Sequence, residues 1–320
     1  MTRAPMLAVG VGEVLWDRLP GGDEIGGAPF NVVSHLARLG HPAACLTAVG
    51  WDSPGDAVIA RMASQGIDTS LVGRVGGIPT GLAQVSLPPG GGPAFTIMRP
   101  AAFEHWAAGD PGRVIAMRPG LLVYGTLAQV RLRARVRLGE IMVGCPAAMA
   151  LYDVNLRDGW WSPEVVADLL ELASVVKLSV AEARELAPVL GLAWQDDPAA
   201  FSVKLARQRG LRAVAITAGP DAASLWLDGD FARAAPPSAK VIGPGRADDA
   251  AAAGESVSAG DSVGAGDAFA AALLDAIGTG LTAAPALRRA NALGALVASR
   301  RGAQPPWTPT ELAALEEASQ

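Results

Sequence analysis

Short apolar runs that alternate with stretches of helical spacing are the feature that most constrains the fold of this chain. The runs are of β type, and Gly or Pro bounds many of them. Because strands separated by helices pair in parallel, the alternation predicts a parallel sheet covered by helices, with ligands at the carboxyl ends of the strands. The expected strands are 6–11, 44–49, 120–124, 150–154, 175–178 and 213–217, and the expected helices are 31–39, 55–65, 163–173 and 181–190.

Two segments depart from this alternation. Residues 72–100 contain the short β runs GLAQVSL and AFTIMR, separated by the turn-forming PPGGGP, which predicts a small antiparallel β flap on the α/β body. Residues 243–260 are rich in Gly, Ala, Ser and Asp, which indicates a flexible surface loop. Two apolar helices are expected after that loop, one following Asp261 and one over 285–300.

Composition excludes several classes of protein. Half of the 320 residues are hydrophobic and 18% are charged, which is typical of a globular chain with a large core. No apolar stretch reaches the roughly 18 residues that a membrane span requires, and a net charge of −5 argues against nucleic acid as the partner. Cys45 and Cys145 lie among apolar or small residues, which favours reduced core thiols in a cytoplasmic protein over a single disulfide.

Arginine alternates with other residues in VRLRARVRLGE, at Arg131, Arg133, Arg135 and Arg137. The pattern has two interpretations, a basic strand that binds phosphate or nucleic acid, and a solvated helix. The acidic charge of the whole chain favours the solvated helix.

The segment DSVGAGDAF carries the sharpest chemical signal. Gly264, Ala265 and Gly266 are small enough for backbone N–H groups to approach an anion, and the helix that begins there adds its unpaired N–H groups and the positive end of its dipole. Asp267 follows directly, and near a helix N-terminus its carboxylate stays ionised and able to accept a proton. The alternative is that Asp267 only caps the helix.

A second glycine-containing segment, EIGGAPFNVVSHLARLG, places Gly26 and Gly27 before an amphipathic helix, with Asn31 in its first turn. Taken alone, it is a turn and a helix cap. Taken with the first segment, it resembles the N-terminal signature of the ribokinase-like (PfkB) carbohydrate kinase family, and DSVGAGDAFAAALLDAIG resembles the C-terminal one. VGWDSPGDAVIARMASQGIDTSLV and DVNLRDGWW extend the resemblance over nearly the whole chain, and the latter is similar to fructokinases.

The resemblance implies one doubly wound α/β domain over 1–320, with a mostly parallel sheet flanked by helices and a small antiparallel β lid from segments near 14–28 and 72–104. It implies a cytoplasmic, ATP-dependent sugar kinase that acts on a primary hydroxyl and forms a homodimer through the lid. Fructose is the leading acceptor, and 2-keto-3-deoxygluconate, ribose or a nucleoside is the alternative.

The resemblance also implies roles for individual residues. Asp267 is expected to be the catalytic base beside an anion hole of Gly264, Ala265 and Gly266. Glu182, with Ser179 where the family usually has Asn, is expected to orient water around Mg²⁺. The other expected contacts are sugar at Asp17, Gly27 and Asn31, substrate or phosphate at Arg157, nucleotide at Thr217, Gly219 and Asn291, and a monovalent cation such as K⁺ at Asp261 and Val263.

Three departures from the family pattern stand beside the resemblance. Val263 replaces the more frequent Thr, Ala222 replaces a Gly in the nucleotide turn, and AAFEHWAAGD stands where fructokinases have an A-A-D turn. A P-loop kinase is disfavoured because no G-x-x-x-x-G-K-[ST] segment occurs, and a Rossmann dehydrogenase because VGVGEV lacks the third glycine. A catalytically silent sugar-binding protein of the same fold remains a third interpretation.

Overall fold

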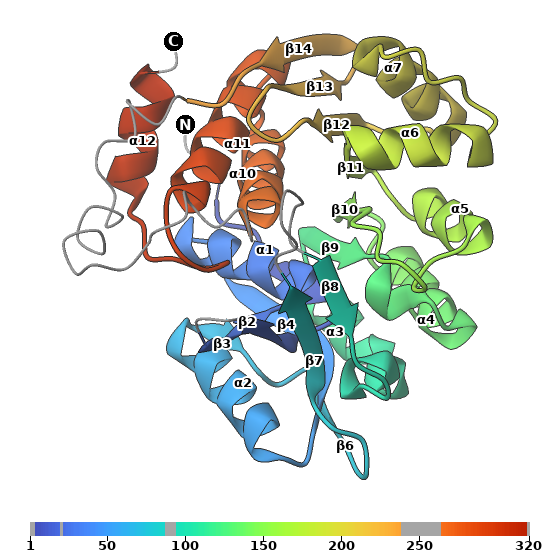
Figure 1. The fold of residues 1–320 in the computed structure, drawn as a ribbon, viewed down its shortest axis with the longest axis vertical. Coiled ribbons are helices and arrows are strands. Elements are labelled where there is room, and N and C mark those ends of the chain that lie inside the picture. Colours follow the sequence, from blue (N-terminus) through green and yellow to red (C-terminus); the bar gives the residue numbers. More distant parts are fainter. Residues whose placement is uncertain (1–3, 20–21, 87–93, 238–263, 319–320) are drawn as a thin grey trace. The chain divides into compact units, whose positions relative to one another are not determined.

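The chain is organised in two compact units. The computed structural model describes residues 4–19, 22–86, 94–237 and 264–318 (Figure 1). The first unit is Pro5–Ala173, and the second is Ser174–Gln320 with Met1–Ala4. Each unit has its own strands and helices, so each is described by itself. The single kinase domain over 1–320 stays a prediction.

The main sheet of the first unit is parallel, as the alternation predicts. β1 lies between β4 and β9, β9 also pairs with β10, and the other edge of β4 pairs with β5 and β6. Every residue of β1, β4 and β9 is buried, which explains why these strands are continuous apolar runs rather than alternating ones. The strands are β1 Ala8–Val11, β4 Ala43–Gly50, β5 Ile67–Asp68, β6 Val72–Val75, β9 Leu121–Gly125 and β10 Met149–Asp153.

A separate four-stranded sheet belongs to the same unit. Its strands are β2 Leu15–Leu19, β3 Gly22–Gly26, β7 Gly81–Ser86 and β8 Ala94–Ile97, in the order β3-β2-β7-β8. The outer pairs are antiparallel, whereas β2 and β7 run parallel, which the long segment of chain between them permits. The expected lid range 72–104 was too long, since β6 pairs with β4 of the main sheet.

The predicted helices of the first unit lie within a few residues of their expected positions, and one further helix, α3, was not predicted. The helices are α1 Ala28–Arg38, α2 Ser53–Ser64, α3 Pro111–Met117, α4 Leu132–Gly144 and α5 Pro163–Glu171, with short 3-10 helices at Ala102–Ala108 and Leu127–Gln129. α1 contacts β1, β4 and β9. It begins three residues earlier than expected, because Pro29 is favourable in a first helical turn.

The arginine-rich segment is helix α4, as expected, but one of its arginines is not solvated. Arg135 is 7% exposed. Its Nε donates to Asp168 Oδ2 at 2.7 Å, and its Nη2 donates to Glu164 Oε1 at 3.2 Å. Arg135 therefore fixes α4 to α5, a role that the alternating pattern did not reveal because pairing depends on a helix about 30 residues further along the chain.

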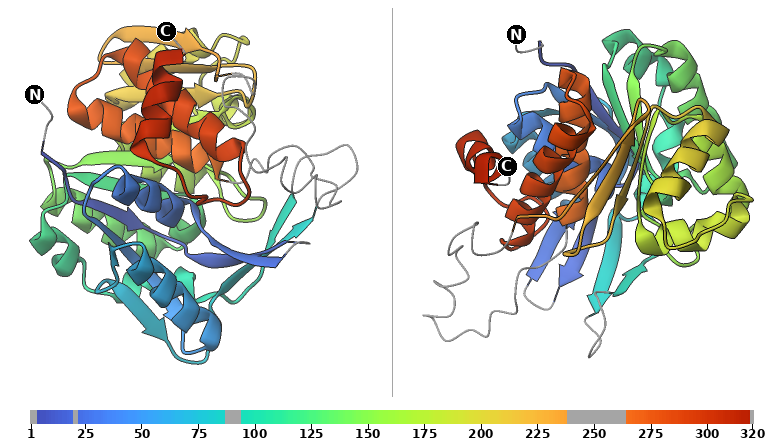
Figure 2. Two further views of the ribbon diagram at one scale, coloured as in Figure 1. Left: turned by 90° about the vertical axis from the view of Figure 1, so that its left-hand side faces the viewer. Right: turned by 90° about the horizontal axis from the view of Figure 1, so that it is seen from above.

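The second unit has helices on both faces of its strands. β11 Val175–Ser179 and β12 Ala213–Thr217 are parallel, and β13 Ala223–Leu227 and β14 Asp230–Ala234 add antiparallel pairs. α10 and α11 lie on one face of these strands, and α6 and α7 lie on the other (Figure 2). The helices are α6 Val180–Val189, α7 Pro198–Arg209, α10 Ala265–Thr279, α11 Ala283–Ala298 and α12 Pro309–Ala318.

Both cysteines are free and buried, as expected for core thiols. Burial, with a smaller contribution from the charge of Glu13, raises the pKa of the Cys45 thiol. The Cys45 thiol therefore stays protonated and unreactive at neutral pH.

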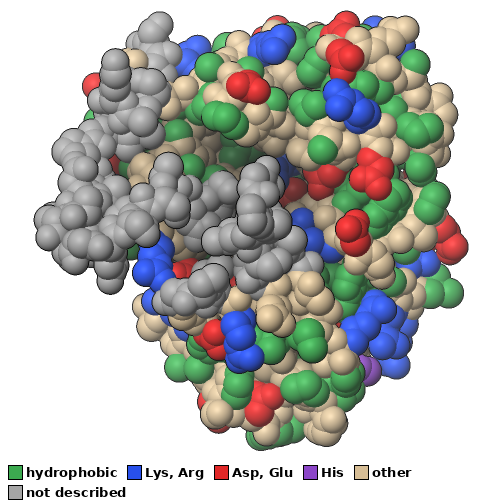
Figure 3. All heavy atoms as spheres, in the orientation of Figure 1, with side chains coloured by type: hydrophobic (Ala, Val, Ile, Leu, Met, Phe, Trp, Pro, Cys, Tyr) green, Lys and Arg blue, Asp and Glu red, His purple; other side chains and the backbone are tan. Residues whose placement is uncertain are grey.

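None of the helices in the described part of the chain combines the length and the apolar character that a bilayer span requires. On the face that Figure 3 shows, acidic and basic side chains are interspersed rather than gathered by sign.

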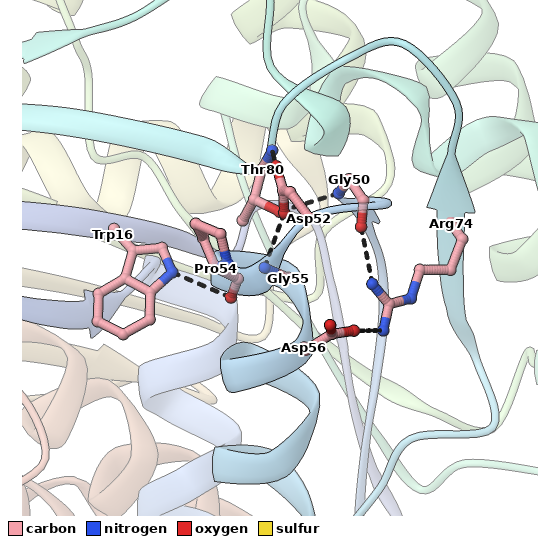
Figure 4. A network of polar contacts seen from close by, with 8 residues as sticks. All are labelled: Trp16, Gly50, Asp52, Pro54, Gly55, Asp56, Arg74 and Thr80. Atoms are coloured by element: carbon pink, nitrogen blue, oxygen red, sulfur yellow. Dashed lines mark hydrogen bonds and ion pairs between the residues drawn. The ribbon is translucent and has the colours of Figure 1, made fainter.

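A hydrogen-bond network around Asp52 joins the end of β4 to the start of α2 (Figure 4). The Asp52 carboxylate accepts bonds from the Gly55 amide at 2.8 Å, the Thr80 amide at 2.8 Å and the Thr80 hydroxyl at 2.6 Å. Arg74 donates to the Gly50 carbonyl at 2.8 Å. Burial opposes ionisation, but the hydrogen bonds from Thr80 and Gly55 and the charge of Arg74 outweigh it and lower the pKa of Asp52.

The small sheet is attached to this network. Trp16 of β2 donates its Nε1–H to the Pro54 carbonyl in the first turn of α2, at 3.2 Å (Figure 4). The glycine-containing segment G-W-D-S-P-G therefore contributes to holding the small sheet against the main body of the first unit.

We expect Asp52→Asn to lower the free energy of unfolding at pH 7 by about 1–3 kcal/mol, because charge-assisted hydrogen bonds are lost. The pKa of Asp52 is lower in the folded protein than in the unfolded chain, so its stabilisation is present above about pH 4 and is lost as the pH falls through the folded value. Urea unfolding of the wild type and of Asp52→Asn at pH 7 and pH 3 measures this effect. The difference in the free energy of unfolding between the two proteins should be smaller at pH 3 than at pH 7. An equal difference at both pH values would contradict the assignment.

Candidate functional site

The first turn of α10 has the geometry of an anion site. The first intrahelical bond runs from the Ala268 amide to the Gly264 carbonyl at 2.9 Å, so the amides of Ala265, Gly266 and Asp267 precede it. These amides point out of the helix N-terminus, where the positive end of the dipole attracts negative groups. The anion hole of Gly264, Ala265 and Gly266 stays a prediction, and this turn is the place where it is sought.

Glycine is required at the start of this turn. Gly264 has φ 79°, in the left-handed region. A Cβ at Gly264 would lie 2.5 Å from Ala303 Cα. On the other side, a Cβ at Gly294 of α11 would lie 3.2 Å from the Ala265 carbonyl oxygen, so α11 also packs closely against the turn. The turn is thus held by the segment after α11 and by α11 itself.

Asp267 is the third residue of α10 and is partly exposed. The rest of the helix, from Ala268 to Gly278, is buried. Asp267 is therefore the acidic group that α10 presents at its N-terminal end, beside the amides. Such a carboxylate can accept a proton, and it can also serve as a cap.

The predicted nucleotide turn follows β12. Thr217 is the last residue of that strand, and Gly219 adopts φ 59° in the turn that the Ala218 amide closes onto the Ala222 carbonyl at 2.9 Å. Ala222, where the family has Gly, lies outside the left-handed region. A side chain at Ala222 is therefore compatible with the backbone of this turn.

Asn291 lies in a small pocket between β14 and α11. The pocket has a volume of about 230 Å³, and Ala234, Pro237 and Leu287 are among the residues that line it. Asn291 donates from Nδ2 to the Ala234 carbonyl at 3.0 Å. Gly294, which packs against Ala265, lies about one turn further along α11 than Asn291. One helix thus connects this pocket with the start of α10.

Glu182 forms a capping box at the start of α6. Its Oε2 accepts from the Ser179 amide at 2.7 Å and from the Ser179 hydroxyl at 2.9 Å, and the Glu182 amide donates to Ser179 Oγ at 3.2 Å. The capping box fixes the orientation of this carboxylate at the carboxyl end of β11. In the described residues, no three His, Cys, Asp or Glu side chains come together as a metal site.

The structure brings three of the predicted sugar-binding residues together in the first unit. Asp17 of β2 is 7% exposed, and a Cβ at Gly26 of β3 would collide with its carboxylate. Gly27 has φ 117°, and a Cβ there would collide with the Glu13 carbonyl oxygen. Paired glycines are therefore needed where β3 passes into α1. Asn31 follows in the first turn of α1, and its backbone N–H donates to the Gly27 carbonyl at 2.8 Å.

Arg157 lies apart in the chain, in the loop after β10. Asn155 of this loop has φ 41°, a conformation that Asn tolerates better than most residues, and Arg157 donates from Nη1 to the Leu156 carbonyl at 2.9 Å. β10 and β1 belong to the same parallel sheet, so this loop and the segment after β1 leave the sheet at the same edge. Asp261 and Val263, predicted to bind a monovalent cation, lie outside the described residues.

Sequence reasoning gave no role in these sites to two residues. Gly26 stood out only as the first glycine of the pair, whereas the structure shows that it leaves room for the Asp17 carboxylate. Lys177 of β11 is 9% exposed and lies against Gly266. The signal for Lys177 was a single charged residue within the apolar run VVKLS.

The chain is similar in sequence to known carbohydrate kinases. The model of the pfkB family of carbohydrate kinases matches residues 22–311. Fructokinase-1 of Oryza sativa subsp. japonica is 30% identical over 307 residues, which cover 91% of this chain and 87% of that protein. A putative sugar kinase of Pyrococcus horikoshii is 27% identical over 164 residues, which cover 49% of this chain and 53% of that protein.

Solved structures share the fold. A fructokinase of Xylella fastidiosa with bound ATP has a TM-score of 0.78 at 23% identity, covering 98% of this chain and 99% of that one. A 2-dehydro-3-deoxygluconokinase of Thermotoga maritima has a TM-score of 0.79 at 18% identity, covering 99% of this chain and 100% of that one. The predicted ribokinase-like fold, a mostly parallel sheet flanked by helices with a small separate sheet, is confirmed.

Proposed function

Because the chain belongs to the pfkB family of carbohydrate kinases and is therefore an ATP-dependent sugar kinase, we propose that it transfers the γ-phosphoryl group of ATP to a primary hydroxyl of fructose. The observation that carries the proposal is the first turn of α10, where Asp267 follows directly on the amides that precede the first intrahelical bond. A base and an anion site in one helical turn suit a reaction that deprotonates an alcohol and moves a phosphoryl group.

In this reaction, the sugar hydroxyl oxygen forms a bond to the γ-phosphorus, and the bond from that phosphorus to the bridging oxygen of ADP breaks. Asp267 accepts the proton of the hydroxyl. The amides of Ala265 and Gly266 stabilise the charge on the oxygens of the transferring group. Because phosphoryl transfer has a loose transition state, positioning and electrostatic stabilisation account for most of the rate.

Residues of the first unit are proposed to bind the sugar. Asp17 accepts hydrogen bonds from sugar hydroxyls, Asn31 both donates and accepts them, and Gly27 lets the chain turn close to the ligand. Fructose is preferred because GEVLWDRLP, GGAPFN and DVNLRDGWW resemble fructokinases, and because the rice relative named fructokinase is similar over 91% of the chain. The small sheet, by the same resemblance, acts as a lid and as the surface of a homodimer.

The nucleotide is assigned to residues of the second unit. Thr217 ends β12 and Gly219 lies in the turn after it, and the Asn291 pocket of about 230 Å³ has the size of a base rather than of a whole nucleotide. Mg²⁺ would neutralise charge on the ATP phosphates, and Glu182 would orient its water, since Mg²⁺ characteristically keeps several waters. A K⁺ ion near Asp261 and Val263 belongs to the same proposal.

A sugar acid is the second candidate acceptor. The guanidinium of Arg157, at the carboxyl edge of the main sheet of the first unit, suits a carboxylate as well as a phosphate. The position of Arg157 favours 2-keto-3-deoxygluconate over ribose or a nucleoside, because neither ribose nor a nucleoside carries a carboxylate.

The acceptor is tested by measuring ADP release from ATP and Mg²⁺, with and without K⁺, across ketoses, aldoses, sugar acids and nucleosides. We expect fructose to have the highest kcat/KM and phosphorus NMR to place the phosphate on a primary carbon. A higher kcat/KM for 2-keto-3-deoxygluconate would replace fructose by the second candidate. Absence of turnover with every acceptor, in protein shown to be folded, would favour a silent sugar-binding protein.

Two variants test whether Asp17 binds the sugar. Asp17→Asn should raise the KM for the sugar about tenfold or more and leave the KM for ATP unchanged, because hydrogen bonds to a charged group are lost. Asp23→Asn, an exposed acid on the neighbouring strand β3, is the control and should leave both values unchanged. Equal effects of the two variants would remove Asp17 from the sugar site.

A further inference from the structure

Lys177 is a buried charge that the proposed reaction does not yet use. It is the third residue of β11 and is 9% exposed. Lysine is rarely buried to this degree, because its ammonium loses hydration unless negative groups surround it. We therefore expect this buried ammonium, which lies beside a candidate anion site, to interact with negatively charged groups.

The ammonium lies against the first turn of α10. A Cβ at Gly266 would be 3.0 Å from Lys177 Nζ and 3.7 Å from Cε. Gly266 thus leaves the space that the lysine head group fills. Residues two apart on a strand lie on the same face, so Lys177 shares a face of β11 with Ser179, the capping partner of Glu182.

The charges around the first turn of α10 indicate which kind of ligand Lys177 binds. The N-terminus of a helix carries partial positive charge, so a cation placed there is unfavourable unless negative charge is also present. Asp267 supplies one negative charge in the same turn. The terminal phosphates of ATP would supply more, and a compact ammonium with three donors is well suited to bind them.

We propose that the Lys177 ammonium binds the terminal phosphoryl oxygens of ATP at the first turn of α10 and stabilises the charge on them during transfer. This inference rests on the proposed function, because that function places the nucleotide phosphates at α10. The amides of the turn and the ammonium then contact the same group from two elements, α10 and β11. No bond to Lys177 forms or breaks.

The first test uses the wild-type chain and needs no turnover. The chain has only three lysines, Lys177, Lys204 and Lys240, so ammonium resonances of ¹⁵N-labelled lysine can be assigned with Lys204→Arg and Lys240→Arg. We expect saturating ATP to shift the Lys177 resonance, and adenosine, which lacks phosphates, to leave it unchanged. No shift with ATP, or an equal shift with adenosine, would overturn the proposal.

The second test is Lys177→Met, which removes the charge and keeps a side chain of similar length. We expect kcat to fall roughly 100-fold or more and the affinity for ATP to fall about tenfold, with adenosine affinity unchanged. Lys204→Met, at an exposed position of α7, is the matched control and should behave as wild type. Values of kcat and ATP affinity within twofold of wild type would overturn the proposal.

The two proposals fail in different ways. If the wild-type chain phosphorylates no acceptor, the proposed function fails, while the ammonium resonance still reports whether Lys177 meets ATP phosphates. If the wild-type chain is active and Lys177→Met is equally active, the lysine proposal fails alone.

Discussion

Asp267→Asn is expected to lower kcat about a thousandfold or more, while the affinity for ATP stays within a fewfold of wild type. Asparagine has nearly the same size but cannot accept the proton of the sugar hydroxyl, and positioned general bases contribute about 10²–10⁴ in rate. The loss corresponds to roughly 4 kcal/mol of transition-state stabilisation. The measurement is steady-state kinetics with the best acceptor, together with calorimetric titration of ATP.

The choice of asparagine separates catalysis from helix capping. Asp267 is the third residue of α10, whose N-cap is Gly264, so its non-catalytic role would be to stabilise the helix terminus by its charge. Loss of that charge would lower stability slightly and leave kcat unchanged. Asp197→Asn provides the matched control, because Asp197 caps α7 of the same unit through the Ala199 and Ala200 amides, at 3.0 and 3.1 Å. If the two variants retained the same activity, Asp267 would only stabilise the helix terminus and the catalytic assignment would fail.

Gly264→Ala is expected to reduce both stability and activity. A side chain at φ 79° is strained, which costs about 1–3 kcal/mol, and the new Cβ would lie only 2.5 Å from Ala303 Cα. The turn must then shift, which moves the Ala265 and Gly266 amides away from the transferring group. We expect kcat to fall about 100-fold or more, as for the loss of an oxyanion donor.

Gly280→Ala is the control for this change. Gly280 ends the same helix with φ 89°, but no atom lies within 4 Å of a Cβ built there. Gly280→Ala therefore imposes the backbone strain without the collision and should lose about 1–3 kcal/mol of stability with kcat unchanged. Urea unfolding and kcat are measured on both variants. Equal losses of kcat would show that the start of α10 has no special part in the reaction.

The parallel strands, the helices and the glycine turn of α10 could be predicted because each depends on residues close together in the chain. Apolar runs such as that of β4 are continuous since both faces of the strand are buried, and helices such as α5 have apolar positions at helical spacing. Helix boundaries were off by up to three residues, because caps such as Asp52 of α2 define them more sharply than hydrophobic spacing does.

Pairings between distant segments could not be predicted in this way. β6 pairs with β4, and β2 runs parallel to β7, although the residue pattern assigned 72–100 to one antiparallel element. Arg135 looked like one of several solvated arginines until α5 supplied Asp168 as its partner. Strand pairing and side-chain pairing are decided by which surfaces can be buried together, a property that local patterns do not contain.

For the candidate site, the sequence by itself determined the small residues before Asp267, the helix that begins there and the paired glycines before Asn31, because backbone freedom and helix initiation are local properties. Only the tertiary structure decided that Ala303 closes against Gly264 and that Lys177 fills the space beside Gly266. Those contacts join residues 39 and 89 positions apart, and packing of β11, α10 and α11 alone brings them together.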